Sequence, residues 1–146
     1  MSQGIRIRCI SESAGPIVRY AYHLYNDSVS VQFEVGGSYD ELIDFGRQLQ
    51  QYPLVYFNDE QEYQAVFQKG KNRPRFLWYF RIEVFAYKTN GAAAVKMVYD
   101  NNAAAEYRNR AAFSIRTSPA SIVELGHLLA TWKPTEQAEV VWVADE

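Results

Sequence analysis

The chain contains a single cysteine, Cys9, among its 146 residues. One thiol cannot form a disulfide within the chain, which excludes the disulfide-rich scaffolds of small secreted domains and fits a reducing compartment. No apolar run approaches the roughly 18 residues that a membrane-spanning helix needs. The first residues, MSQGIRIRCISES, alternate apolar residues with arginine, unlike the apolar centre of a signal peptide. We therefore expect a soluble cytoplasmic protein that does not enter a membrane.

Residues that signal catalysis are also scarce. His23 and His127 are the only histidines, and neither has a second His or Cys at a metal-ligand spacing. The sequence lacks the phosphate-binding loop, the dinucleotide fingerprint, the zinc-protease motif and the nucleophile elbow. Cys9 continues the alternation of Ile5 and Ile7, which is typical of a small buried apolar residue. The sequence therefore predicts no catalytic residue, no metal site and no cofactor, and hence no enzyme.

Charge and composition narrow the class of protein further. The net charge of −2 provides no general attraction to nucleic acid or to an anionic membrane. A hydrophobic fraction of 48% with 22% charged residues is typical of a soluble globular protein. The length fits one domain, residues 1–146, with a core of ordinary size. The aromatic fraction is high, at 15%.

One element occurs twice. Residues 38–52 (SYDELIDFGRQLQQY) align without a gap with residues 118–132 (SPASIVELGHLLATW). Both segments predict amphipathic helices, with Ser38 and Ser118 as N-caps. Glycine inside a helix costs about 1 kcal/mol relative to alanine, so its recurrence at Gly46 and Gly126 predicts close packing of the helix backbones. Residues 36–37, two glycines before the first helix, predict a tight strand-to-helix turn, and an anion site there is the alternative.

Alternating apolar and polar residues predict strands before each helix. The predicted strands are residues 5–10, 17–25 and 28–35 in the first half, and 75–88, 92–99 and 107–116 in the second. Turns are expected at Asn26-Asp27, at Asn90-Gly91 and around residues 100–102. Short apolar runs at 54–57 and 140–143 predict a strand after each helix, and residues 62–68 predict an extra strand before the halves join.

These elements predict an α+β fold with a mostly antiparallel sheet and two amphipathic helices. Each half, residues 1–70 and 73–146, reads as βββαβ, and the boundary is the segment KGKNRPR at 69–75. A three-stranded sheet with one helix is thin, so we expect the two halves to pack together around a pseudo-twofold axis. The alternative is that the halves are alike only because both follow the same hydrophobic pattern.

The strand predicted at 75–88 is apolar on both faces. If one face is left uncovered by the helices, it forms a surface that requires a partner, because Tyr, Trp and Arg dominate protein interfaces. The candidate partner-binding residues are Tyr79, Arg81, Phe85 and Tyr87, together with Asp59 and Glu60 of an acidic run.

The segment VQFEVGGSYDELIDFGRQLQQY, with its relative AAFSIRTSPASIVELGHLLATW, resembles strand-then-helix segments of small bacterial immunity proteins. The resemblance implies a cytosolic α+β protein without enzymatic activity that binds a toxin and blocks it. The matching positions are mostly apolar patterning, so the resemblance transfers no binding residue. The favoured hypothesis is accordingly a protein-binding module, and the pattern also leaves a homodimer open.

The alternative is binding of single-stranded nucleic acid. Duplicated sheet-and-helix units with aromatic sheet faces are similar in outline to single-strand binders of the Whirly and PUR kinds. Lys69, Lys71, Arg73 and Arg75 lie just before the aromatic strand, and bases stack on aromatic side chains beside such charges. The negative net charge disfavours this hypothesis, and a solvated basic linker explains the cluster equally well.

Overall fold

The computed structural model describes residues 2–11, 17–52, 64–70, 79–88, 91–134 and 136–145. Over these residues the protein has the expected α+β fold. The first half contains β1 (Gly4–Ser11), β2 (Ile17–Tyr25), β3 (Ser30–Ser38), α1 (Tyr39–Gln50) and β4 (Gln64–Gly70). The second half contains β5 (Tyr79–Ala86), β6 (Ala93–Asp100), a short 3-10 helix (Ala105–Tyr107), β7 (Arg110–Thr117), α2 (Pro119–Ala130) and β8 (Glu139–Val143). Both halves thus show the predicted βββαβ order.

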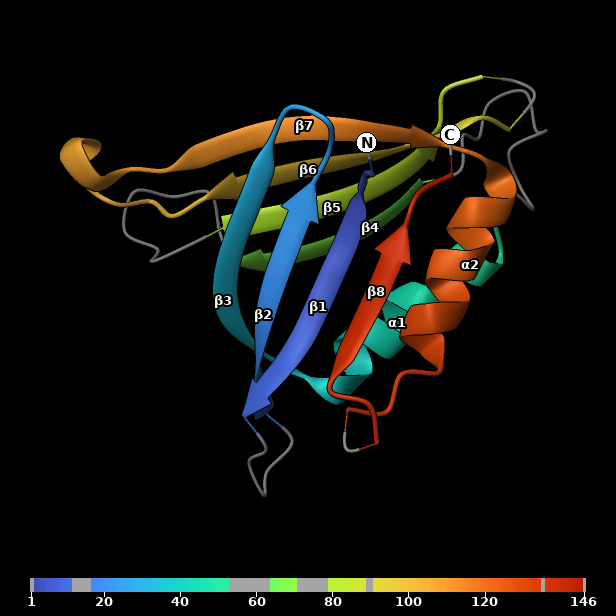
Figure 1. Ribbon diagram of the computed structural model, residues 1–146, viewed down its shortest axis with the longest axis horizontal. Coiled ribbons are helices and arrows are strands. Elements are labelled where there is room, and N and C mark those ends of the chain that lie inside the picture. Colours follow the sequence, from blue (N-terminus) through green and yellow to red (C-terminus); the bar gives the residue numbers. More distant parts are fainter. Residues whose placement is uncertain are drawn as a thin grey trace.

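The strands form two four-stranded antiparallel sheets. The first sheet has the order β3-β2-β1-β8 and the second has the order β4-β5-β6-β7. Figure 1 shows the first sheet in front of the second, with the strands of the two sheets crossing, and both helices side by side at one end of the molecule. The helices pack closely against each other.

The last strand of each half belongs to the sheet of the other half. β4 follows α1 in the chain but pairs with β5, and β8 follows α2 but pairs with β1. The sequence predicted that the two halves pack together, but not that each half adds its last strand to the sheet of the other half. The pattern of a strand specifies which face it buries and not which strand it pairs with. The exchange joins the halves through both sheets, so that a single core serves the whole chain.

The segment predicted to join the halves, residues 69–75, begins within β4. Lys69 and Gly70 end β4, where they pair with Phe80 and Tyr79 of β5, so they belong to a strand and not to a linker. Residues 71–75, like the short strand predicted at 54–57, lie outside the described residues. The extra strand predicted at 62–68 corresponds to β4.

Hairpins form at two of the three predicted turns, although Asn90 of the second turn lies outside the described residues. The backbone N–H of Asn26 donates to the carbonyl of Val29 at 2.8 Å and closes the β2–β3 hairpin. The N–H of Tyr87 donates to the carbonyl of Ala92 at 3.0 Å, and Gly91 has a φ of 89°, a backbone conformation that favours glycine.

The third turn is longer than the sequence predicted. β7 begins at Arg110 and not at residue 107, because the side chain of Asn101 organises the loop before it. Its Oδ1 accepts the N–H groups of Ala103 and Asn109, and its Nδ2 donates to the carbonyl of Tyr107. An Asn side chain that satisfies backbone groups in this way competes with strand pairing.

The helices begin where the sequence predicted. Ser38 and Ser118 occupy the two N-cap positions, and the Oγ of Ser118 accepts the N–H of Ser121 at 3.2 Å, whereas the side chain of Ser38 makes no cap hydrogen bond. Residues 36–37 continue β3 and do not form the tight turn that the glycines predicted.

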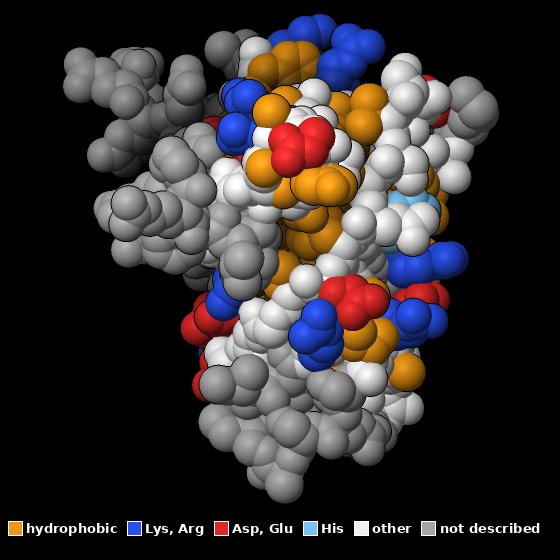
Figure 2. Space-filling view, turned by 90° about the vertical axis from the view of Figure 1, so that its left-hand side faces the viewer, with side chains coloured by type: hydrophobic (Ala, Val, Ile, Leu, Met, Phe, Trp, Pro, Cys, Tyr) orange, Lys and Arg blue, Asp and Glu red, His pale blue; other side chains and the backbone are white. Residues whose placement is uncertain are grey.

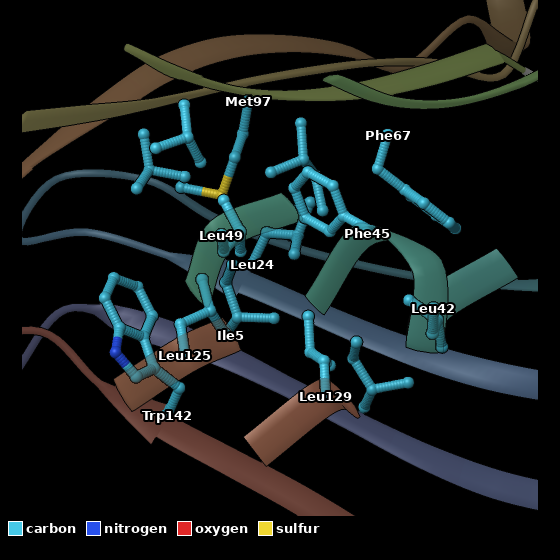
Figure 3. Packing of buried hydrophobic residues seen from close by; sticks show 14 of the residues in the cluster. Ile5, Leu24, Leu42, Phe45, Leu49, Phe67, Met97, Leu125, Leu129 and Trp142 are labelled. Carbon is cyan, nitrogen blue, oxygen red and sulfur yellow. The ribbon is translucent and has the colours of Figure 1, made fainter. Parts of the chain in front are cut away.

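One hydrophobic core lies between the sheets and the helices. Leu42, Phe45 and Leu49 of α1 meet Leu125 and Leu129 of α2 in this core, and each of these side chains is at most 3% exposed. Figure 3 shows these residues beside labelled side chains of both sheets, namely Ile5, Leu24, Trp142, Phe67 and Met97. A fully buried side chain of this size contributes ~1.5–3 kcal/mol to stability, so the core draws comparable support from both halves.

Neither helix described here is long and apolar enough to cross a membrane.

Candidate functional site

The outer face of the first sheet carries the clearest candidate site. Strand alternation turns Ile5, Ile7, Tyr20 and Tyr22 into the core, where they are buried. The intervening residues point the opposite way. Figure 1 looks onto this outer face, and no helix lies in front of it. We define the binding face as Arg6, Arg8, Arg19, Ala21, His23, Gln32, Glu34, Glu139 and Val141.

The centre of the binding face is hollow. A depression of about 420 Å³ is lined by Arg6, Arg8, Ala21, Tyr22, His23, Gln32, Phe33, Glu34 and Glu139. Ala21 pairs with Arg8 on one side and with Glu34 on the other. Because its side chain is a single methyl group among long neighbours, it leaves room between the charged groups.

The charged residues of the binding face form two exposed ion pairs, and Arg8 takes part in neither of them. The Nε of Arg19 lies 3.1 Å from Oε1 of Glu34, and the Nε of Arg6 lies 3.6 Å from Oε1 of Glu139. Arg8 lies between these pairs and has no carboxylate partner among the described residues. Exposed ion pairs contribute about 0–1 kcal/mol, so a bound molecule can rearrange them at little cost.

His23 lines the same hollow. Its Nε2 and the Oγ of Ser30 are joined by a hydrogen bond of 2.7 Å, and its ring centroid is 4.7 Å from that of Tyr25. Partial burial, and then the charge of Arg6, lower the pKa of His23 below its usual 6.5. His23 is therefore neutral at neutral pH and can both donate and accept a hydrogen bond.

A Ser–His hydrogen bond also occurs in nucleophilic catalysis, where a third group orients the histidine. No described residue provides such a group for His23, and no cluster of three or more His, Cys, Asp or Glu residues able to hold a metal ion occurs in the described ranges. Cys9 is half-buried against the core, and His127 is exposed. Its contacts leave His23 as a hydrogen-bonding group that lines the hollow.

The predicted partner-binding residues lie on the outer face of the second sheet. Tyr79, Arg81 and Phe85 point away from the core and are half-buried. Arg81 is held by Oε1 of Gln68 at 3.1 Å and by Glu83 at 3.4 Å. Tyr87 follows the strand and is 40% exposed, and Lys88 lies over its ring at 5.7 Å. Asp59 and Glu60 lie outside the described residues.

A smaller hollow of about 160 Å³ lies beside Tyr79 on this second face. Asp100 is buried at its edge, where Arg108 donates to both carboxylate oxygens, at 2.6 and 3.1 Å, and Arg110 lies at 3.3 Å. The hydrogen bonds from Arg108 hold the pKa of Asp100 below its usual value. These partners satisfy the carboxylate within the fold, so the cluster primarily braces the β6–β7 hairpin.

Of the four predicted nucleic-acid residues, only Lys69 lies in the described part of the chain, and it is paired with a carboxylate. The Nζ of Lys69 donates to both carboxylate oxygens of Glu41 in the first turn of α1, each at 2.7 Å. Lys69 lies on the core side of β4, where its neighbour in the sheet is Phe80. Lys71, Arg73 and Arg75 lie outside the described residues.

The sequence interpretation missed Arg6, Arg8 and Glu34 as a group. They occupy the polar positions of three alternating strands, and no short segment of the sequence contains all three. The available signal was the register of the β2–β3 hairpin, which places Ala21 beside Glu34. The pairing of β1 with β2 was not predictable to the residue, because it depends on the length of the loop between them.

Comparison with known proteins gives no assignment: no protein-family model, no curated protein and no solved structure matches the chain.

Proposed function

We propose that this chain is a non-enzymatic protein-binding module that engages a protein partner through the binding face of the first sheet. The observation that carries the proposal is the hollow beside Arg8, on a sheet face that no described helix covers. In keeping with the resemblance to immunity proteins, we propose that binding blocks the activity of the partner.

The charges of the binding face support a protein partner. Arg6, Arg19, Glu34 and Glu139 are exposed and weakly paired, so a partner with complementary charges can recruit them. Complementary charges across an interface give specificity and speed association. Arg8 provides one positive charge that the described residues do not neutralise, and it favours an acidic group of the partner at the hollow.

Strand β8 adds exposed apolar side chains to one side of the binding face. Val141 and Val143 of β8 point outward and are 38% and 49% exposed. Protein interfaces combine apolar contacts with polar groups in this way, and exposed apolar side chains beside an open hollow are typical of a binding surface. The outer face of the second sheet, which includes Tyr79 and Phe85, is a second candidate surface for a partner. Its side chains are less exposed than those of the binding face.

The nucleic-acid hypothesis has less support. Lys69, one of its four basic residues, is occupied by Glu41, and the binding face mixes both signs of charge where a single-strand binder has a basic groove. A small anionic ligand at Arg8 is the other candidate that a specific observation favours, because the hollow places an arginine without a carboxylate partner beside the neutral His23.

Capture of partners from a lysate of the native host, with and without nuclease treatment, tests the proposal. Arg8→Glu should weaken capture of a protein partner about tenfold or more, which corresponds to about 1.4 kcal/mol. Arg47→Glu is the matched control, because Arg47 is an exposed arginine on α1 and belongs to neither outer sheet face. Capture that nuclease abolishes would favour nucleic acid. If both variants capture the partner equally well, the partner does not bind through the binding face, and the proposal is wrong on this point.

A further inference from the structure

β3 is an edge strand of the first sheet. β2 pairs along one side of it over all nine residues, and no described strand pairs along the other side. An edge strand presents a row of unpaired N–H and C=O groups to solvent, and another extended chain can hydrogen-bond to them.

The register identifies which backbone groups face the free edge. The bond from Asn26 N–H to the Val29 carbonyl closes the hairpin, so the N–H and C=O groups of Val31, Phe33 and Val35 point toward β2. Those of the intervening residues, Gln32, Glu34 and Gly36, point toward the free edge. No described group hydrogen-bonds to them there.

The other three edges each carry a feature that discourages pairing. β8 has only five residues, and β4 carries Lys69. β7 carries Arg110 and Arg116, and the carbonyl of Ser114 on its free edge already accepts a hydrogen bond from Nδ2 of Asn26 at 3.1 Å. Native edges are protected by short length, by basic residues and by such coverage.

β3 has none of these protections. Its sequence, SVQFEVGGS, contains no proline, lysine or arginine, and its register with β2 runs without a bulge. The equivalent of Glu34 in the second half is Ser114, whose carbonyl accepts a hydrogen bond from Asn26. The two equivalent edges therefore differ: the edge of β7 is partly covered at this position, and the edge of β3 is not.

A strand added beside β3 would contact polar side chains on the outer face of the sheet and apolar side chains on the inner face. On the outer face its side chains would lie next to Gln32 and Glu34. Glu34 is the only charged residue of β3, and a basic side chain of the added strand can replace Arg19 in its exposed ion pair. On the inner face the side chains of the added strand would lie next to Val31 and Phe33. Figure 2, which views the molecule from the side on which β3 lies in Figure 1, shows hydrophobic side chains gathered in the middle of the view and charged side chains below them.

The inner face offers aromatic as well as aliphatic contacts. The ring of Phe33 stacks on that of Tyr99 at 4.3 Å, and Val31, Tyr99 and Phe113 are only partly buried against the core. A segment that alternates apolar with polar residues would place its apolar side chains beside this group and its polar side chains beside Glu34.

We propose that the free edge of β3 binds an extended segment of a protein partner that alternates apolar and basic residues, and that this segment adds a fifth strand to the first sheet. The inference rests on the proposed function, of which it specifies the partner. A second copy of this chain is a poor occupant, because antiparallel pairing of two β3 strands about their centres brings Glu34 close to its own copy, and like charges opposite each other destabilise a sheet. Main-chain hydrogen bonds would supply the affinity and the alternate side chains the specificity.

Amide hydrogen exchange measured by NMR tests the proposal on the intact chain. The probe is an acetylated and amidated eight-residue peptide that alternates lysine with valine or phenylalanine. We expect it to slow exchange of the N–H groups of Gln32, Glu34 and Gly36 about tenfold or more, since they change from solvent-exposed to hydrogen-bonded. The N–H groups of Val31 and Phe33, which already face β2, should change little. A peptide of the same composition without alternation, and one N-methylated at every second residue, should leave all these rates unchanged.

Two variants of β3 test separately the outward N–H groups and the charge of Glu34. Gln32→Pro removes one outward N–H but keeps the ladder to β2 and the charge of Glu34, since proline is tolerated on a free edge. The matched control is Ala112→Pro, at the equivalent position on the β7 edge. Glu34→Lys keeps the N–H and reverses the charge. We expect Gln32→Pro and Glu34→Lys, but not Ala112→Pro, to weaken peptide binding about tenfold. A peptide with glutamate in place of lysine should bind Glu34→Lys better than the wild type.

The outcomes separate this inference from the proposed function. If a native partner is captured through Arg8 but leaves the outward amides of β3 exchanging at the free rate, the edge proposal is wrong and the proposed function stands. If the alternating peptide protects those amides but no protein partner is captured, the edge binds strands and the proposed function fails. Equal protection by the non-alternating peptide, or none at millimolar peptide, also overturns the edge proposal.

Discussion

The carbonyl oxygen of Gly126 lies 2.7 Å from the position that a Cβ on Gly46 would occupy, and the carbonyl oxygen of Gly46 lies 2.7 Å from the position of a Cβ on Gly126. The relationship extends to the residues that follow: Gly46 also faces Leu129 and Ala130, and Gly126 faces Leu49 and Gln50 at the same sequence offset. The two helices therefore meet around a pseudo-twofold axis at their glycines. A side chain at either position would meet backbone atoms and not the flexible end of another side chain.

Gly46→Leu and Gly126→Leu should each destabilise the protein by about 1–3 kcal/mol, because overpacking must separate the helix backbones. Leucine is a better helix former than glycine, which offsets less than about 1 kcal/mol of that cost. Glu124→Leu, at an exposed position of α2, is the matched control and should change stability little. Urea denaturation measures the free energies of unfolding. Glycine variants as stable as the wild type would show that the helices are not held at this distance.

These glycines also show what the sequence could predict of the fold. Recurrence at the same position of two aligned helices was enough to predict close backbone packing, because the reason is local and repeated. The pairing of β4 with β5 and of β8 with β1 was not predictable in this way. Both strands have the right pattern for burial on one face, and either sheet satisfies that pattern. The exchange depends on where the chain leaves α1 and α2, which only the assembled core determines.

Asp145 stabilises the N-terminus of α2 from outside the helix. Its carboxylate accepts hydrogen bonds from Oγ1 of Thr117 at 2.6 Å, from the N–H of Ser118 at 2.9 Å and from the Oγ of Ser118. The hydrogen bonds from Ser118 and Thr117 lower the pKa of Asp145 below its usual 3.8. Asp145→Asn should therefore cost about 1 kcal/mol at pH 7, as the loss of a cap does.

The pH dependence of this effect has a definite sign. Because the pKa of Asp145 is lower in the folded state, its stabilisation is fully present above the unfolded pKa and is lost as the pH falls through the folded pKa. The difference between wild type and Asp145→Asn should thus shrink as the pH falls from 4 toward 2. Asp27→Asn, an exposed turn carboxylate to which no described residue donates, should show no such difference. A gap that persists at pH 2 would contradict the role of the charge.

Two arginines contact the buried carboxylate of Asp100, and they differ in how strongly they hold it. Arg108 makes two hydrogen bonds to it, whereas Arg110 contributes one longer contact and has a side chain that is 68% exposed. Arg108→Gln should lower the melting temperature, because it leaves a buried acceptor short of two donors, and Arg110→Gln should lower it less. The two variants control for each other in thermal denaturation. A larger effect at Arg110 would contradict this order.

The candidate site was less predictable than the core. The charges at Arg6, Arg8 and Glu34 are visible in the sequence, but their meeting around Ala21 depends on the register of three strands. The candidates on the second sheet were found because one strand contains nearly all of them. Sequence patterning therefore favours sites within a single element over sites assembled from several. Adjacency in the sequence also could not show the partner of Lys69, which pairs with Glu41 of a distant helix.

Two further substitutions address catalysis. His127→Ala and Cys9→Ser should leave the binding activity largely intact, because neither residue belongs to the binding face or completes a catalytic group among the described residues. The measurement is capture of the partner, alongside the melting temperature of each variant. Loss of activity in one variant without loss of stability would point to chemistry at that residue.

The last prediction concerns nucleic acid, and Lys69 changes how it must be tested. Replacing Lys69 would leave Glu41 without its partner, so loss of binding in such a variant would confuse folding with recognition. The informative variant keeps Lys69 and changes Lys71, Arg73 and Arg75 to Gln. If these three residues held a phosphate backbone, the logarithm of the affinity would fall with the logarithm of salt concentration with a slope of about −2, at about −0.7 per phosphate neutralised.

We expect no such binding, because the net charge of −2 provides no wider basic field around these residues. The experiment titrates labelled single-stranded DNA and RNA into the wild type and the triple variant at low and at moderate salt. Lys133→Gln, an exposed lysine elsewhere on the chain, is the control for a general effect of charge. Micromolar binding at moderate salt that the triple variant loses and Lys133→Gln keeps would reverse the order of the two binding hypotheses. No binding even at low salt would eliminate the nucleic-acid hypothesis and leave the binding face and the β3 edge to a protein.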